Sequence, residues 1–224
     1  MRVLAIETST LAGGVALLED ERVVAEYALD VRVTHSERVM AAVDQLMRDA
    51  GWERDVLEGL AVAVGPGSFT GLRIGLSTVK GLALSLGIPV SSVPTLDAMA
   101  AAFPFAALPV CPVIDARKGE VYTSLYRWAR TGMERTCDYL ALAPEALAGR
   151  LVEATILAGD GASRVHSPHA RLAPSVPRLP SAAAVGMLGL QRLRAGDAVP
   201  ASALVPIYLR PSEAELKRRA LALA

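Results

Sequence analysis

Hydrophobic and polar positions along this chain of 224 residues follow two patterns, which predict strands and helices in turn. Short apolar runs bounded by turn residues are typical of buried strands, whereas apolar residues three and four positions apart are typical of helices. Residues 3–6, 14–18 and 23–28 fit the first pattern. Residues 36–50 fit the second, and Gly51 ends that helix.

The same patterns continue through the middle of the chain. Residues 60–64 are wholly apolar, which indicates a central strand covered on both faces. A glycine-rich loop follows at 65–71, and then a helix to residue 86, a strand at 88–93 and a short helix that opens at Thr95. The order of three strands, helix, strand and helix predicts an α/β lobe.

The second half repeats this order loosely, which predicts a duplicated lobe. Its expected strands lie at 110–114, 121–128, 136–140 and 155–158, and its expected helices at 144–151 and 181–196. The strand before Glu7 corresponds to the strand before Asp115, since each ends in a carboxylate. The strand before Gly65-Pro66-Gly67 corresponds to the strand before Gly159-Asp160-Gly161.

We place the boundary between the lobes in the proline-rich stretch 104–109. The first lobe then spans residues 1–107 and the second spans residues 108–224, with the tail 205–224 expected to pack back on the first lobe. The stretch 168–180 holds four prolines and is predicted to be a surface loop.

Composition excludes several classes of protein. Lysine and arginine total 23, and so do aspartate and glutamate, which argues against a chain that binds nucleic acid tightly through phosphates. A hydrophobic content of 52% excludes a disordered chain. Two cysteines give no disulfide framework, and Glu7 comes too early for a signal peptide. We therefore expect a soluble, cytoplasmic protein without membrane association.

Two turns at strand ends are candidates for phosphate binding. Gly65 and Gly67 stand where a strand meets a helix, and free backbone N–H groups at a helix start attract anions. The first strand ends in a carboxylate and three hydroxyls, namely Glu7, Thr8, Ser9 and Thr10. Both turns also have a purely structural interpretation, as a tight turn under a helix and as a hairpin that satisfies its own backbone.

The sequence offers no clear catalytic centre. His166 and His169 are separated by Pro168, and no cysteine or third histidine stands near them, whereas a metal site needs three or four ligands. His35 is best explained as part of a helix start. We predict neither catalytic residues nor a bound metal.

Four segments together resemble the TsaB family, also called YeaZ. They are residues 4–10 (LAIETST), 65–75 (GPGSFTGLRIG), 115–122 (DARKGEVY) and 206–210 (PIYLR). The likeness spans the whole chain, and the second and third segments are the specific ones. The resemblance implies an actin-like, Hsp70-like ATPase fold (ASKHA) with two ribonuclease-H-like lobes, of which the second is reduced.

The resemblance also implies a role in forming threonylcarbamoyladenosine on the tRNA adenosine next to the anticodon. There the family supplies a non-catalytic subunit that binds and supports its paralogue TsaD, has TsaE as a further partner and meets tRNA only indirectly. TsaD proteins hold a metal with two histidines, and Thr95 and Met99 occupy those positions here. A hydroxyl and a thioether are poor substitutes, which also speaks against the family's old label as peptidase M22 or glycoprotease.

In this family two helices of the first lobe pair with TsaD, or with themselves in a homodimer. The residues expected at that interface are Val39, Met40, Val43, Leu46, Met47, Leu72, Leu76 and Val79. No cofactor is required, but the two candidate turns leave room for a weak ATP or ADP site shared with TsaD. The alternative function is a small ATP-dependent phosphotransferase of the same fold, with Glu7 and Asp115 near the phosphates.

Overall fold

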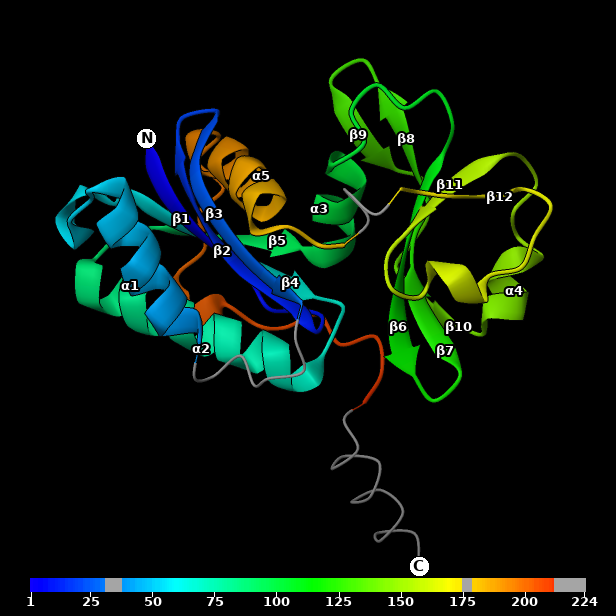
Figure 1. Ribbon diagram of the computed structural model, residues 1–224, viewed down its shortest axis with the longest axis horizontal. Coiled ribbons are helices and arrows are strands. Elements are labelled where there is room, and N and C mark those ends of the chain that lie inside the picture. Colours follow the sequence, from blue (N-terminus) through cyan, green and yellow to red (C-terminus); the bar gives the residue numbers. More distant parts are fainter. Residues whose placement is uncertain (31–37, 175–178, 212–224) are drawn as a thin grey trace, which may run out of the picture.

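The computed structural model describes residues 1–30, 38–174 and 179–211. Two α/β lobes lie side by side, with the short helix α3 (Thr95–Ala101) between them (Figure 1). The expected helix start at residues 35–37 and the last thirteen residues of the tail, 212–224, lie outside the described residues.

The first lobe is built on a sheet with the strand order β3-β2-β1-β4-β5. These strands are β1 (Arg2–Glu7), β2 (Ala12–Glu19), β3 (Arg22–Asp30), β4 (Gly59–Gly65) and β5 (Val90–Pro94). β1 runs antiparallel to β2 and parallel to β4. β4 is buried along its whole length, which agrees with its wholly apolar sequence.

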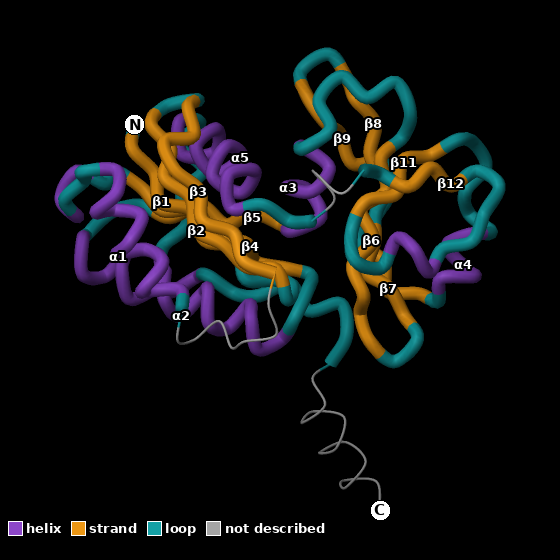
Figure 2. Tube along the Cα trace, viewed as in Figure 1, coloured by secondary structure: helices purple, strands orange, loops and turns teal. Residues whose placement is uncertain are grey.

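Helices cover both faces of this sheet (Figure 2). α1 (Val39–Ala50) and α2 (Phe69–Leu86) lie on one face, and α5 (Ala182–Arg194) lies on the other. Because side chains alternate along a strand, Leu4 and Ile6 pack toward α1 and α2, whereas Val3 and Ala5 pack toward α5. Short 3₁₀ helices complete the described chain at Arg54–Val56, Ala162–Arg164 and Ala201–Ala203.

The second lobe repeats the first with the strand order β10-β7-β6-β11-β12. Its elements are β6 (Val110–Arg117), β7 (Glu120–Thr123), β8 (Tyr126–Ala129), β9 (Gly132–Arg135), β10 (Leu140–Leu142), α4 (Pro144–Ala148), β11 (Thr155–Ala158) and β12 (Ala170–Leu172). β6 runs antiparallel to β7 and parallel to β11, as β1 does to β2 and β4. The predicted duplication is confirmed by this order.

Three predicted elements of the second lobe need correction. The strand expected at 121–128 is divided after Thr123, because the chain leaves β7 and begins a separate hairpin of β8 and β9. The strand expected at 136–140 is replaced by β9 and β10, which flank that segment. β12 lies in the stretch predicted as a loop and pairs with β11. An alternating pattern marks a strand but does not mark where the chain changes its pairing partner.

The division of the chain at residue 107 also needs correction, because α5 packs on the first lobe. Val185 and Leu190 of α5 are buried in one cluster with Val3 and Ala5 of β1. A side chain at Gly189 would overlap the Cβ of Ala61, so this glycine allows the helix to lie close to the sheet. The first lobe is therefore assembled from both ends of the chain.

Seven of the eight side chains expected at a partner interface are buried inside the first lobe. They are Val39, Val43, Leu46, Met47, Leu72, Leu76 and Val79. Six of them pack with Leu4, Ile6 and Val62 of the central strands, and Leu72 is equally inaccessible. Met40 alone of the eight is exposed. The expectation is therefore corrected: the sheet covers the apolar stripes of α1 and α2, and these stripes do not form a surface.

Replacing Val43 with glutamate is expected to destabilise the fold itself. The Val43 side chain is 5% exposed, and an ionised carboxylate there would be buried without a partner. We expect a loss of more than about 3 kcal/mol in the free energy of unfolding, measured by urea titration. Ala41→Glu, on the exposed side of the same helix, is the control and should change stability by less than about 0.5 kcal/mol. An unchanged value for Val43→Glu would remove this residue from the core.

Candidate functional site

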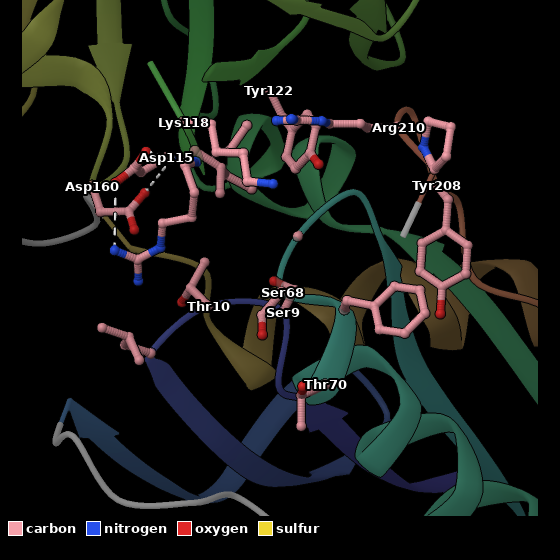
Figure 3. Close-up of a pocket in the computed structure, with 17 residues that line it drawn as sticks. Ser9, Thr10, Ser68, Thr70, Asp115, Lys118, Tyr122, Asp160, Tyr208 and Arg210 are labelled. Carbon is pink, nitrogen blue, oxygen red and sulfur yellow. Dashed lines mark hydrogen bonds and ion pairs between the residues drawn. The ribbon is translucent and has the colours of Figure 1, made fainter. Parts of the chain in front are cut away.

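A cleft with a volume of about 450 Å³ lies between the two lobes (Figure 3). Its first-lobe wall is the turn after β1 and the start of α2, which contribute Ser9, Thr10, Ser68 and Thr70. The second-lobe wall contributes Asp115, Arg117, Lys118, Tyr122 and Asp160, and the tail segment contributes Tyr208, Arg210 and Pro211. All four segments that carry the family resemblance therefore contribute to the cleft. Of the first segment, residues 4–10, only Ser9 and Thr10 line it.

The first-lobe wall is held by direct packing of one backbone turn on another. The Ser68 N–H donates to the Ser9 carbonyl at 2.6 Å, and the Thr8 hydroxyl donates to the Gly71 carbonyl at 2.8 Å. A Cβ at Gly67 would overlap the Ser9 carbonyl, and a Cβ at Gly71 would overlap that of Thr8. These glycines thus permit a close approach of two backbones, as the structural interpretation of the loop predicts.

The six candidate phosphate residues divide into two groups. Ser9, Thr10 and Gly67 line the cleft. The other three, Glu7, Thr8 and Gly65, are buried and are not among the lining residues. The Ser9 hydroxyl is buried at the cleft wall beside the Glu7 carboxyl, and by distance and angle it has no hydrogen-bond partner within the described residues.

Glu7 is a buried carboxyl group behind that wall. Its Oε1 accepts a hydrogen bond from the Ser9 N–H at 2.7 Å, while Oε2 has no partner in the described part of the chain. Burial raises the pKa of Glu7 to about 7, because a charged carboxylate is poorly solvated there. Glu7 is therefore not a fixed negative charge that faces the cleft.

Asp115 occupies the equivalent position in the second lobe but lies at the cleft. Its Oδ1 accepts the Arg117 N–H at 2.9 Å, which repeats the bond between Glu7 and Ser9. Arg164 donates to the same oxygen at 2.7 Å and balances its charge. Asp160 accepts the Asp115 N–H at 2.9 Å, and burial raises the pKa of Asp160.

The tail, which was expected to pack back on the first lobe, contacts α2 and also closes one side of the cleft, a place that no sequence pattern indicated. Tyr208 stacks on Phe69 with ring centroids 4.7 Å apart, and its hydroxyl accepts a hydrogen bond from Arg73 at 3.2 Å. Arg210 pairs with Glu120 of β7 at 3.2 Å. No local pattern signals this arrangement, because the partners are up to 139 positions apart in the sequence.

The residues at the expected histidine positions are part of the interior. Thr95 begins α3, and Met99 lies one turn later in a cluster with residues of the second lobe. Between them Asp97 accepts hydrogen bonds from the hydroxyls of Tyr126 and Tyr139 at 2.8 and 2.7 Å. No sequence pattern pointed to this cluster, because its residues are 29 and 42 positions apart.

The described residues contain neither a metal-binding cluster nor a membrane-spanning helix. Among these residues no group of three or more His, Cys, Asp or Glu side chains is placed to hold a metal ion. No helix within the same residues has the length and hydropathy needed to cross a membrane.

The Glu7 carboxyl should make stability depend on pH. Between the ordinary pKa of 4.5 and the folded value of about 7, the folded state keeps a proton that the unfolded chain has released, so stability falls as pH rises. At 1.36 kcal/mol per pKa unit this amounts to about 3 kcal/mol. We expect Glu7→Gln to gain that much relative to the natural protein between pH 4.5 and 7.5 in urea titrations. Glu21→Gln, an exposed control, should show no trend, and a flat difference for Glu7→Gln would contradict its burial.

Three comparisons place the chain among known proteins. The family model described as "TsaD: tRNA N6-adenosine threonylcarbamoyltransferase" matches residues 30–156. The tRNA threonylcarbamoyladenosine biosynthesis protein TsaB of Bacillus subtilis (strain 168) is 34% identical over 227 residues, which covers 97% of this chain and 97% of that protein. The structure of YeaZ from Pseudomonas aeruginosa matches with a TM-score of 0.80 and 31% identity, over 93% of this chain and 99% of that one.

A distant match supports the fold alone. Component A of the (R)-2-hydroxyglutaryl-CoA dehydratase of Acidaminococcus fermentans matches with a TM-score of 0.53 and 9% identity, over 87% of this chain and 99% of that one. It has an actin-like ATPase fold, so the predicted fold is confirmed. Because the similarity to the Bacillus protein extends over nearly the whole of both sequences, the chain belongs to the TsaB family, also known as YeaZ.

Proposed function

We propose that this protein acts in the biosynthesis of threonylcarbamoyladenosine in tRNA, as a non-catalytic subunit that binds and supports a TsaD-type transferase. The observation that carries the proposal is the similarity to the Bacillus subtilis TsaB protein over 97% of both chains. The match of residues 30–156 to the transferase family supports a common origin of the two subunits. TsaE is the further partner, and contact with tRNA is indirect.

The chemistry of α3 supports the assignment as a partner rather than a transferase. Thr95 is 0% exposed and Met99 is 2% exposed, so both are part of the core. A hydroxyl and a thioether are weak ligands for the metals that histidine pairs bind. Asp97, which lies between them, is engaged by two tyrosines. This helix therefore connects the lobes in the place where a transferase needs a metal site.

We place the partner surface on the outer sides of α1 and α2, in place of the buried stripes. Ser77, Gly81 and Leu84 recur with helical spacing along α2, and Leu84 is 78% exposed. Met40 adds an exposed apolar side chain on α1. Nothing lies within 4 Å of a Cβ built on Gly81, so a partner helix can approach the backbone closely there. The same surface pairs with itself in the homodimer and with TsaD in the complex.

Gly81→Arg tests this surface without disturbing the fold. The position is open and helical, and arginine favours a helix by up to about 1 kcal/mol over glycine, so the variant should fold at least as well. We expect it to lose both dimerisation in sedimentation and capture of TsaD. Gly149→Arg, at an exposed position of the second lobe, is the matched control and should keep both. If Gly81→Arg still dimerises and binds TsaD, the surface is misplaced.

Reconstitution tests the function itself. A mixture of TsaD, TsaE, the threonylcarbamoyl-adenylate donor and tRNA should form little modified nucleoside until this protein is added, and Gly81→Arg should fail to restore it. The protein alone should not turn over ATP. ATP hydrolysis or phosphate transfer by the purified chain, together with unchanged nucleoside yield when it is omitted, would favour the phosphotransferase alternative.

The cleft gives a second candidate function, a weak site for the phosphates of ATP or ADP. The specific observation is the Ser9 hydroxyl, which is buried at the cleft wall beside the start of α2. Lys118 and Arg210 line other sides of the same cleft. The proposed nucleotide site therefore contains three of the six residues expected from the sequence, namely Ser9, Thr10 and Gly67.

Binding of ADP, alone and with TsaD present, should be detectable by calorimetry, and Ser9→Ala should weaken it several-fold because one hydrogen bond is removed. Ser163→Ala, which removes an exposed hydroxyl of the second lobe that does not line the cleft, is the control. Equal ADP affinity of Ser9→Ala and the natural protein, or no heat of binding at millimolar ADP with TsaD present, would remove the nucleotide site.

A further inference from the structure

Among the described residues, α3 and the segment of residues 205–211, which we call the latch, both contact the two lobes. Their contacts differ in strength. Figure 1 shows α3 on the upper side of the junction and the latch, in orange and red, crossing on the lower side. The cleft is lined by residues of the latch, including Tyr208 and Arg210.

The α3 side is densely packed against both lobes. Leu96 and Met99 lie in the core of the second lobe, while Ala98 on the same helix lies in the core of the first. Asp97 holds the hydroxyl of the buried Tyr126 and faces Arg192 of α5 at 3.5 Å. Burial also raises the pKa of Tyr126, so the tyrosine keeps its proton and remains a donor. Because α3 packs into the cores of both lobes, separating the lobes on this side would expose buried apolar side chains.

The latch is anchored in the first lobe. Leu204, just before it, is 2% exposed in the core that also contains α1 and α2. The Ile207 N–H donates to the Val64 carbonyl at 2.7 Å, and Tyr208 stacks on Phe69. The first lobe thus holds the latch through core packing, one backbone bond, one aromatic contact and the hydrogen bond from Arg73 to Tyr208.

The contact of the latch with the second lobe is much lighter. Arg210 meets Glu120 of β7 in a single ion pair of 3.2 Å, with side chains 27% and 37% exposed. Ion pairs that are open to solvent contribute little net stability and are screened by salt. Tyr122 and Arg210 also lie near each other across the cleft (Figure 3). The two sides of the junction therefore resist separation unequally.

We propose that the latch is a releasable closure: the Arg210–Glu120 ion pair holds the lobes together on one side of the cleft, and the α3 cluster is the pivot on the other. Release of the ion pair lets the second lobe turn away and widens the cleft between its Ser9 wall and its Asp115 wall. A partner or anion that engages Arg210 competes with Glu120 and opens the cleft. This inference does not depend on the proposed function, since it needs neither TsaD nor tRNA.

The distance between the lobes tests the latch. Cysteines at the exposed positions Gln45 of α1 and Glu145 of α4 carry a fluorescence donor and acceptor, in a Cys137→Ser background. The remaining Cys111 is buried with a pKa raised to about 12, which keeps its thiol unreactive. Labelled protein is diluted into unlabelled protein, so that each assembly holds one labelled chain.

Arg210→Glu should shift single-molecule transfer efficiency to lower values and broaden its distribution, with Arg210→Ala intermediate. Glu120→Arg combined with Arg210→Glu should restore the natural distribution. Arg22→Ala breaks an exposed ion pair within the first lobe and is the matched control. Raising salt from 0.05 to 1 M should open the natural protein and leave Arg210→Ala unchanged. Identical distributions for Arg210→Glu and the natural protein, or no rescue by the exchanged pair, would overturn the proposal.

Discussion

Contact between two backbone turns fixes the geometry on which the rest of the structure depends. The turn after β1 and the start of α2 approach so closely that side chains at Gly67 and Gly71 would overlap the opposite carbonyl groups. That approach places α2 on the sheet and gives the cleft its first-lobe wall. It also determines which side of α2 is buried against β1 and β4 and which side, with Gly81 and Leu84, is exposed.

The same turn follows the first strand of each lobe, but its carboxylate has a different environment in the two lobes. Glu7 and Asp115 end equivalent strands, and each accepts the N–H of the residue two positions later. Glu7 is sealed behind the packed glycine loop, whereas Asp115 remains at the cleft and is balanced by Arg164. Both lobes therefore share the backbone pattern of this turn. Only the turn of the second lobe has a carboxylate that lines the cleft.

The candidate site was predictable only in part. Ser9, Thr10 and Gly67 were identified from their places at strand ends, because ligand sites of α/β sheets gather there. The interface residues were misassigned for a physical reason. An apolar stripe shows that a helix face is covered, but a single sequence does not say whether the cover is the chain's own sheet or another protein. Here the sheet covers it.

By itself the sequence determined the strands and helices of the first lobe, the duplication and the family, because periodicity, glycine stops and strand-end motifs are local or repeated signals. Tertiary structure alone decided that α5 returns to the first sheet, that Asp97 meets two tyrosines of the second lobe, and that Arg210 crosses to Glu120. Each of these is a contact between residues about 30 to 190 positions apart. Such contacts depend on how whole elements pack, which no local pattern records.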